Sequence, residues 1–196
     1  MSHTYEVRSH TERLRNRVFS IVTDEVVMPG GEVVTRDYMV HVGAVGVVAL
    51  DADGRVALVR QYRPAVRTVL WELPAGLVDV AGEPLAAAAA RELAEEADLV
   101  AARWDLLAEL HPSPGASNEK IRLFLAREIA TVPEAERHER THEEAELELH
   151  WIDLDEAVGM ALAGEITNAA AACGVLAAAR ARDRGWSTLR PASAAT

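Results

Sequence analysis

The sequence predicts an α/β fold in which a mixed sheet is covered by helices on both faces. Residues 85–97 consist almost entirely of Ala, Leu, Glu and Arg, which are strong helix formers, and apolar segments of strand length lie on both sides of them. Two further helix-like segments follow at 153–164 and 166–184, and the second has Asn168 as a suitable cap. Strands interspersed with helices in the middle and at the end of a chain are typical of an α/β sandwich.

The composition limits the class of protein and its partners. A chain of 196 residues with 49% hydrophobic residues suits a domain of moderate size, and its net charge of −11 argues against a nucleic-acid surface. Cys173 is the only cysteine, so no intrachain disulfide can form, and we expect it to be a small buried hydrophobe. We see neither a signal peptide nor a bilayer-spanning stretch. These features predict a cytoplasmic protein that binds neither nucleic acid nor membrane.

The first forty residues are expected to form a separate small β unit. Residues 17–28 alternate loosely, and Pro29-Gly30-Gly31 predicts a hairpin turn into residues 32–38. Such a unit has little core of its own, so it should pack on the main domain or on a partner chain. We therefore divide the chain into residues 1–40, a main domain at 41–190, and a tail at 191–196 that we expect to be disordered.

Two apolar runs begin the main domain. Residues 41–50 and 55–61 flank the turn sequence Asp51-Ala52-Asp53-Gly54, which predicts a hairpin whose two strands are both central in the sheet. Further strands are expected at 68–73, 104–110, 121–129 and 146–152. The polar segment 131–145 predicts a solvated loop that could also act as a lid.

The helix at 85–97 carries the chemistry. Glu92 and Glu96 are four residues apart and Glu95 is three beyond Glu92, so all three carboxylates project from one flank. Alone, such a face is more often simply solvated. Like charges this close repel, and a divalent cation would relieve the repulsion. Oxygen-only ligands suit Mg²⁺ or Mn²⁺ completed by water and phosphate, so the helix suggests phosphate chemistry.

The two ends and the opposite flank of this helix are also predictable. Pro84 suits the first turn, and Asp98 must end the helix in a left-handed conformation, which Asp tolerates. The flank opposite the carboxylates should lie close against a sheet through small apolar residues, namely Ala86, Ala90, Leu93 and Ala97.

The surrounding spacing resembles the Nudix box, the loop–helix–loop signature of diphosphate hydrolases. Gly76, Glu83 and the run Arg91-Glu92-Leu93-Ala94-Glu95-Glu96 follow its order, with Gly76 expected to allow a sharp turn. The sequence departs from the box twice: the interval from Gly76 to Glu83 is one residue longer, and Asp98 stands where the box has Gly. The extra residue falls in the loop 77–82, where insertions cost little.

Flanking motifs extend the resemblance to ADP-ribose pyrophosphatases over residues 38–179. The matching motifs are Arg60-Gln61-Tyr62-Arg63, Trp71 to Gly76, Gly164-Glu165-Ile166, and Pro114 in the loop beyond the box. The resemblance implies a Nudix-type α/β/α sandwich that hydrolyses ADP-ribose to AMP and ribose 5-phosphate. Two alternatives stay open: hydrolysis of another nucleoside diphosphate derivative, such as a nucleotide sugar, NADH or FAD, and a non-catalytic ADP-ribose sensor.

The resemblance also implies roles for individual residues. Glu92, Glu96 and the carbonyl of Ala75 would hold Mg²⁺ or Mn²⁺, with Glu95 contributing when two or three ions bind. Glu119 fills the position of a loop glutamate that acts as base or metal ligand, and Glu95 is the alternative base.

Arginines and the assembly complete these expectations. Arg91 is best interpreted as a clamp that orients neighbouring carboxylates, because a guanidinium matches carboxylates bidentately. Glu83 would support the loop. Arg63 and Arg36 are candidate substrate contacts, although a surface ion pair is an equally good interpretation of Arg63. Family members of this type are homodimers with exchanged N-terminal strands, which suits the unit at 1–40.

Overall fold

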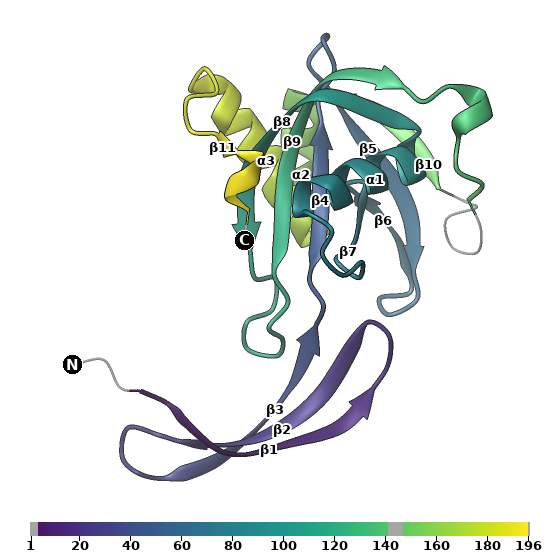
Figure 1. The fold of residues 1–196 in the computed structure, drawn as a ribbon. Coiled ribbons are helices and arrows are strands. Elements are labelled where there is room, and N and C mark those ends of the chain that lie inside the picture. Colours follow the sequence, from purple (N-terminus) through teal and green to yellow (C-terminus); the bar gives the residue numbers. More distant parts are fainter. Residues whose placement is uncertain (1–3, 141–146, 196) are drawn as a thin grey trace. The chain divides into compact units, whose positions relative to one another are not determined.

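The computed structural model describes residues 4–140 and 147–195. It contains two compact units (Figure 1). The first comprises the described residues up to Gly43 together with His111–Lys120, and the second comprises Ala44–Leu110 with the described residues from Ile121 onward. Residues 141–146, which include the end of the predicted polar loop, lie outside this description.

The first unit is a three-stranded antiparallel sheet in the order β1 (Glu6–Arg15), β2 (Phe19–Val27), β3 (Val33–His41). The predicted hairpin corresponds to β2 and β3. We did not predict β1, whose ten residues are all exposed and mostly polar, so it lacks the apolar alternation that indicates a strand. The loop His111–Lys120 belongs to this unit because it pairs with the end of β3: Met39 N donates to Ala116 O at 2.9 Å.

A carboxylate within this sheet provides a test of its electrostatics. The Tyr38 hydroxyl donates to the Asp24 carboxylate at 2.6 Å, and His10 Nδ1 lies 2.6 Å from the other oxygen of that carboxylate. The hydrogen bond from Tyr38 holds the pKa of Asp24 below its usual range. Stability from Asp24 is therefore present above the ordinary carboxyl pKa and lost as pH falls through the lower folded value. We expect Tyr38→Phe to raise this pKa, measured by NMR titration of the carboxyl carbon. An unchanged titration would contradict the assignment.

The second unit contains two sheets. The strands are β4 (Ala44–Ala49), β5 (Arg55–Arg63), β6 (Thr68–Glu72), β7 (Ala75–Leu77), β8 (Leu99–Leu110), β9 (Ile121–Thr131), β10 (Glu148–Asp153) and β11 (Arg190–Pro191). One sheet has the order β11-β8-β9-β4-β7 and the other β10-β5-β6. Because β4 is parallel to β9 and antiparallel to β7, the larger sheet is mixed, as predicted.

The predicted hairpin of the two apolar runs is wrong. The turn itself forms, since Asp51 Oδ1 accepts hydrogen bonds from the amides of Asp53 and Arg55. Beyond one bridge, Leu50 to Val56, the strands diverge into different sheets. Both β4 and β5 are largely buried, and each lies between two other strands of its own sheet, so both are central as expected.

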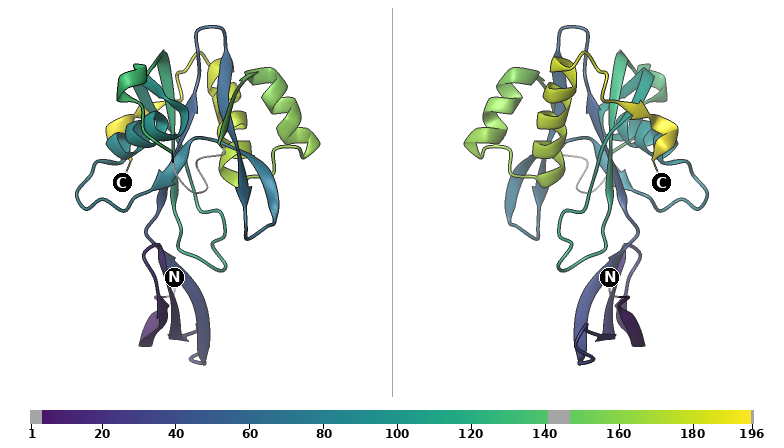
Figure 2. Two further views of the ribbon diagram at one scale, coloured as in Figure 1. Left: turned by 90° about the vertical axis from the view of Figure 1, so that its right-hand side faces the viewer. Right: turned by 90° about the vertical axis from the view of Figure 1, so that its left-hand side faces the viewer.

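Helices cover both faces of the larger sheet. The teal helix α1 (Leu85–Ala97) and the yellow-green helix α3 (Ala169–Asp183) lie on opposite sides of its strands (Figure 2). Alternation along β4 explains this: Val45 and Val47 join the core cluster of α1, whereas Val48 joins that of α3 and α2 (Leu154–Ala163). The predicted α/β/α sandwich is confirmed. No helix among the described residues is both long and apolar enough to cross a bilayer.

Four local details differ from the sequence expectations. Pro84 is the N-cap of α1 and precedes its first turn. The buried face of α1 consists of Ala88, Ala89, Leu93, Glu96 and Ala97, so the carboxylate of Glu96 lies on the face that we expected to be apolar. Cys173 is only partly buried, because it packs at the edge of the core.

The fourth difference from the sequence expectations concerns the C-terminal residues. Pro191, at the start of the tail that we expected to be disordered, is the second residue of β11, which pairs with β8, and the next three residues form a 3₁₀ helix, η3 (Ala192–Ala194). Arg190 donates to Glu109 at 3.0 Å, and Ala192 packs against the core cluster that contains the buried residues of α1. These contacts are with residues distant in the chain, so they could not be predicted from the local sequence.

Candidate active site

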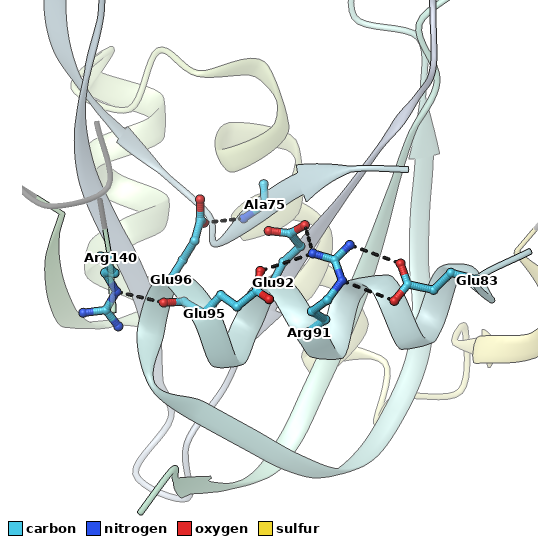
Figure 3. A network of polar contacts seen from close by, with 7 residues as sticks. All are labelled: Ala75, Glu83, Arg91, Glu92, Glu95, Glu96 and Arg140. Carbon is cyan, nitrogen blue, oxygen red and sulfur yellow. Dashed lines mark hydrogen bonds and ion pairs between the residues drawn. The ribbon is translucent and has the colours of Figure 1, made fainter. Parts of the chain in front are cut away.

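Arg91 is the centre of a polar network on α1 (Figure 3). Its Nε and Nη2 donate to the two carboxylate oxygens of Glu83 at 3.2 and 3.1 Å, and Nη1 donates to Glu92 at 2.6 Å and Glu95 at 3.2 Å. Hydrogen bonding to Glu83, reinforced by the charge of Glu92, raises the pKa of the Arg91 guanidinium above its ordinary value. Arg91 thus contacts three neighbouring carboxylates, as its interpretation as a clamp requires.

Gly76 lies beneath the carboxylate of Glu92. A Cβ built on Gly76 would overlap the carboxyl carbon and both oxygens of Glu92. Our expectation that Gly76 forms a sharp turn is wrong, because it sits in β7, paired with Val45, without a positive φ. Its glycine is required for the close approach of Glu92 instead.

The carboxylate of Glu96 is held by the backbone of β7. Its Oε2 accepts a hydrogen bond from the Ala75 amide at 2.8 Å, and the residue is 8% exposed. The short strand β7 therefore supplies both the amide that holds Glu96 and the open space over which Glu92 lies. The two carboxylates come from successive turns of α1 and are both largely buried.

The charges of this network favour a cation. The carboxylates of Glu83, Glu92 and Glu95 share the guanidinium of Arg91, and a fourth carboxylate, that of Glu96, accepts from the Ala75 amide (Figure 3). As the side chains stand, the described residues include no group of three His, Cys, Asp or Glu arranged to coordinate a metal. Glu92 and Glu95 are instead hydrogen-bonded to Arg91. Hard oxygen donors with excess negative charge have the donor chemistry that a divalent cation requires.

A cavity of about 400 Å³ opens beside this network. Arg91, Ala94 and Glu95 of α1 form one wall, and Val132 with residues 136–139 forms the other. Glu136 of the second wall is the last residue of the 3₁₀ helix η1 (Glu134–Glu136). The described part of the predicted polar loop thus packs along the carboxylate-bearing helix.

One residue of this region, Arg140, was not predicted from the sequence. Arg140 donates through Nε to the Glu95 carbonyl at 2.8 Å and through Nη2 to Asp98 Oδ2 at 2.6 Å. It lies in the polar segment 131–145, which we interpreted as a solvated loop. The only sequence feature that could have indicated its role is that it is an arginine surrounded by acidic residues. Its partners are distant in sequence, so periodicity could not identify them.

Comparison with known proteins decides the family. The NUDIX domain family matches residues 40–172. The chain belongs to the Nudix hydrolase family. It is 43% identical over 189 residues to the ADP-ribose pyrophosphatase of Mycobacterium tuberculosis (strain ATCC 25618 / H37Rv), covering 96% of this chain and 89% of that protein. It is 28% identical over 153 residues to the ADP-ribose pyrophosphatase of Bacillus subtilis (strain 168), covering 78% and 80%.

A solved structure supports the Nudix fold. The crystal structure of an ADP compounds hydrolase matches with a TM-score of 0.78 and 18% identity, covering 93% of this chain and 97% of that one. The two departures from the Nudix box are accommodated locally. The longer loop makes a turn from Val80 to Glu83 with Gly82 at φ +80, and Asp98 ends α1 in the left-handed conformation at φ 54, as predicted.

The remaining candidate residues of this Nudix hydrolase are Glu119, Arg36 and Arg63. Glu119 belongs to the first unit, where its backbone amide donates to the Ser117 hydroxyl oxygen at 2.9 Å and its carboxylate lies 3.8 Å from the His41 ring nitrogen. Arg36, on β3, is also in that unit and is exposed. Arg63 forms a bidentate pair with the buried Glu72 at 2.9 and 2.6 Å. This geometry matches the ion-pair interpretation of Arg63, which was the alternative to a substrate contact.

Proposed function

We propose that this protein hydrolyses the diphosphate bond of ADP-ribose to AMP and ribose 5-phosphate in the cytoplasm. The observation that carries the proposal is the 43% identity, over 96% of the chain, to a protein named ADP-ribose pyrophosphatase. The carboxylate network of α1 supports the same reaction, because its half-buried acids have the donor chemistry that a diphosphate-binding cation needs.

The residues of α1 and β7 prepare the site for a divalent cation, Mg²⁺ or Mn²⁺. Glu92, Glu96 and the Ala75 carbonyl would hold it, with Glu95 as a further ligand. When bound, such ions neutralise diphosphate oxygens and lower the pKa of a water molecule toward neutrality. Arg91 keeps the acids oriented when no cation is bound, and the Ala75 amide fixes the rotamer of Glu96.

Glu119 is the proposed base that takes the proton of the attacking water, with Glu95 as the alternative. We expect Glu119→Gln to lower kcat about a hundredfold with little change in KM, as for a group that acts in the transition state. The loop should keep its structure, because the backbone amide and carbonyl of Glu119 make its hydrogen bonds to Ser117 and His111. Unchanged turnover would remove Glu119 from the mechanism and direct attention to Glu95.

A substrate panel tests the proposed activity. The full chain is assayed with Mg²⁺ or Mn²⁺ on ADP-ribose, GDP-mannose, NADH and FAD, and kcat/KM is compared. We expect ADP-ribose to be preferred; less than about a threefold preference over GDP-mannose, under 1 kcal/mol of discrimination, would contradict the substrate assignment. Binding of ADP-ribose without turnover would instead favour the sensor alternative.

We also propose a homodimer formed through the N-terminal sheet, with strand exchange as the expected arrangement. β1 exposes Val7 and Leu14 at 50% and 51%, and a three-stranded sheet has little core to stabilise it alone. Light scattering should give twice the chain mass of 21.2 kDa. The double substitution Val7→Asp and Leu14→Asp should shift the protein toward the monomer, whereas a monomeric wild type would overturn the proposal.

A further inference from the structure

The C-terminal turn of α1 has an unfavourable electrostatic composition. Glu95, Glu96 and Asp98 place three acids at the end of the helix, where the backbone dipole is negative. The last turn of α1 contains no basic residue of its own. The turn that carries two proposed cation ligands is therefore strained by its own charges before any cation binds.

Arg140 brings the missing positive charge from a distant segment. Its Nε satisfies the Glu95 carbonyl, one of the carbonyls that a helix end leaves without an intrahelical partner, and its Nη2 pairs with the Asp98 carboxylate. The side chains of Arg140 and Asp98 are 24% and 21% exposed, so this pair is only partly screened by water. In Figure 3, Arg140 faces the end of the helix at which Glu95 and Glu96 lie.

Asp98 links three segments at this point. Its amide closes the helix on Ala94 and Leu93, its carbonyl accepts from the Val132 amide at 2.8 Å, and its carboxylate pairs with Arg140. A glycine here would allow the same left-handed backbone but could not form the ion pair. The aspartate therefore adds a side-chain connection between the helix end and the segment 132–140.

We propose that Arg140 is a positioning residue that, through Asp98 and the Glu95 carbonyl, fixes the turn carrying Glu95 and Glu96 for divalent cation binding. The inference rests on the proposed cation-holding role of these glutamates. Without Arg140, the three acids repel one another and the dipole, so the last turn frays and its carboxylates lose their common orientation.

Titration calorimetry of the full chain with Mn²⁺, without substrate, tests this inference. Arg140→Ala should weaken Mn²⁺ binding about tenfold or more, which is the usual effect of losing a group that orients a metal ligand. Arg140→Lys should recover part of the loss, since an ammonium restores charge without the guanidinium fork. Arg182→Ala is the matched control: it removes a pair with Asp155 at 2.6 and 3.2 Å between α3 and α2 and should bind Mn²⁺ like the wild type.

The outcomes separate the inference from the proposed function. If the wild type binds no Mn²⁺, the proposed function fails and the inference fails with it. If wild type and a folded Arg140→Ala bind equally, the inference alone is overturned. Should Arg140→Ala not fold, Asp98→Asn replaces it, because Asn tolerates the left-handed conformation and removes only the charge. A smaller loss of affinity in Asp98→Asn supports the inference, and an unchanged affinity overturns it.

Discussion

Replacing Glu96 with glutamine is expected to lower kcat about a thousandfold, equivalent to about 4 kcal/mol, because a bound cation contributes several kcal/mol of transition-state stabilisation. Glutamine retains a carbonyl oxygen that can accept the hydrogen bond of the Ala75 amide, so the helix end should keep its position on β7. The substitution therefore removes the negative charge of a largely buried ligand while preserving its packing. Steady-state kinetics and Mn²⁺ titration measure the two consequences.

Glu156→Gln is the control for this substitution. Glu156 lies exposed on α2, which packs in a different core cluster from α1, so kcat and Mn²⁺ affinity should match the wild type. If Glu96→Gln kept both wild-type turnover and wild-type Mn²⁺ affinity, Glu96 would be a structural acceptor for the Ala75 amide and would hold no cation. Full activity with weakened Mn²⁺ binding would instead place Glu96 at an ion that the reaction does not need.

Local composition made α1 predictable, whereas long-range pairing did not show in the sequence. The bounds Leu85–Ala97 and the left-handed Asp98 follow from helix propensity and from the short list of residues that tolerate positive φ. β4 pairs with β9 and β7, and β5 pairs with β10 and with β6, so the hairpin that the adjacent apolar runs suggested does not form. β1 was missed for a related reason, since pairing with β2 stabilises it without apolar alternation.

The candidate site was predictable to the extent that its residues share one helix. Helical spacing placed Glu92 and Glu95 within reach of Arg91, whereas Glu96 lies on the buried face of α1 and accepts from the Ala75 amide. Arg140 could not be found in this way, because the loop that carries it reaches α1 only in the folded chain. The role of Gly76 in a short strand could not be predicted either. A glycine in the sequence suggested a sharp turn, whereas the structure shows that a side chain at this position would overlap the Glu92 carboxylate.

This overlap makes Gly76→Ala the second large prediction. The backbone of Gly76 is compatible with alanine, so the sheet should survive, and the added methyl must displace the Glu92 carboxylate. We expect kcat/KM to fall about a hundredfold, since a misplacement of about 1 Å costs that much in well-aligned sites. Gly159→Ala is the matched control. A Cβ at Gly159, inside α2, meets no atom within 4 Å, so this variant should gain stability and keep its activity.

A double substitution shows whether the methyl acts through Glu92. Glu92→Asp shortens the side chain by one methylene, which should impair the wild type by withdrawing the carboxylate but should cost less when Gly76 is already alanine. The two changes would then be non-additive in kcat/KM, as expected for groups in contact. Strict additivity would mean that the methyl at position 76 disturbs β7 itself, for example its pairing with Val45, and that the space beneath Glu92 is not what the reaction requires.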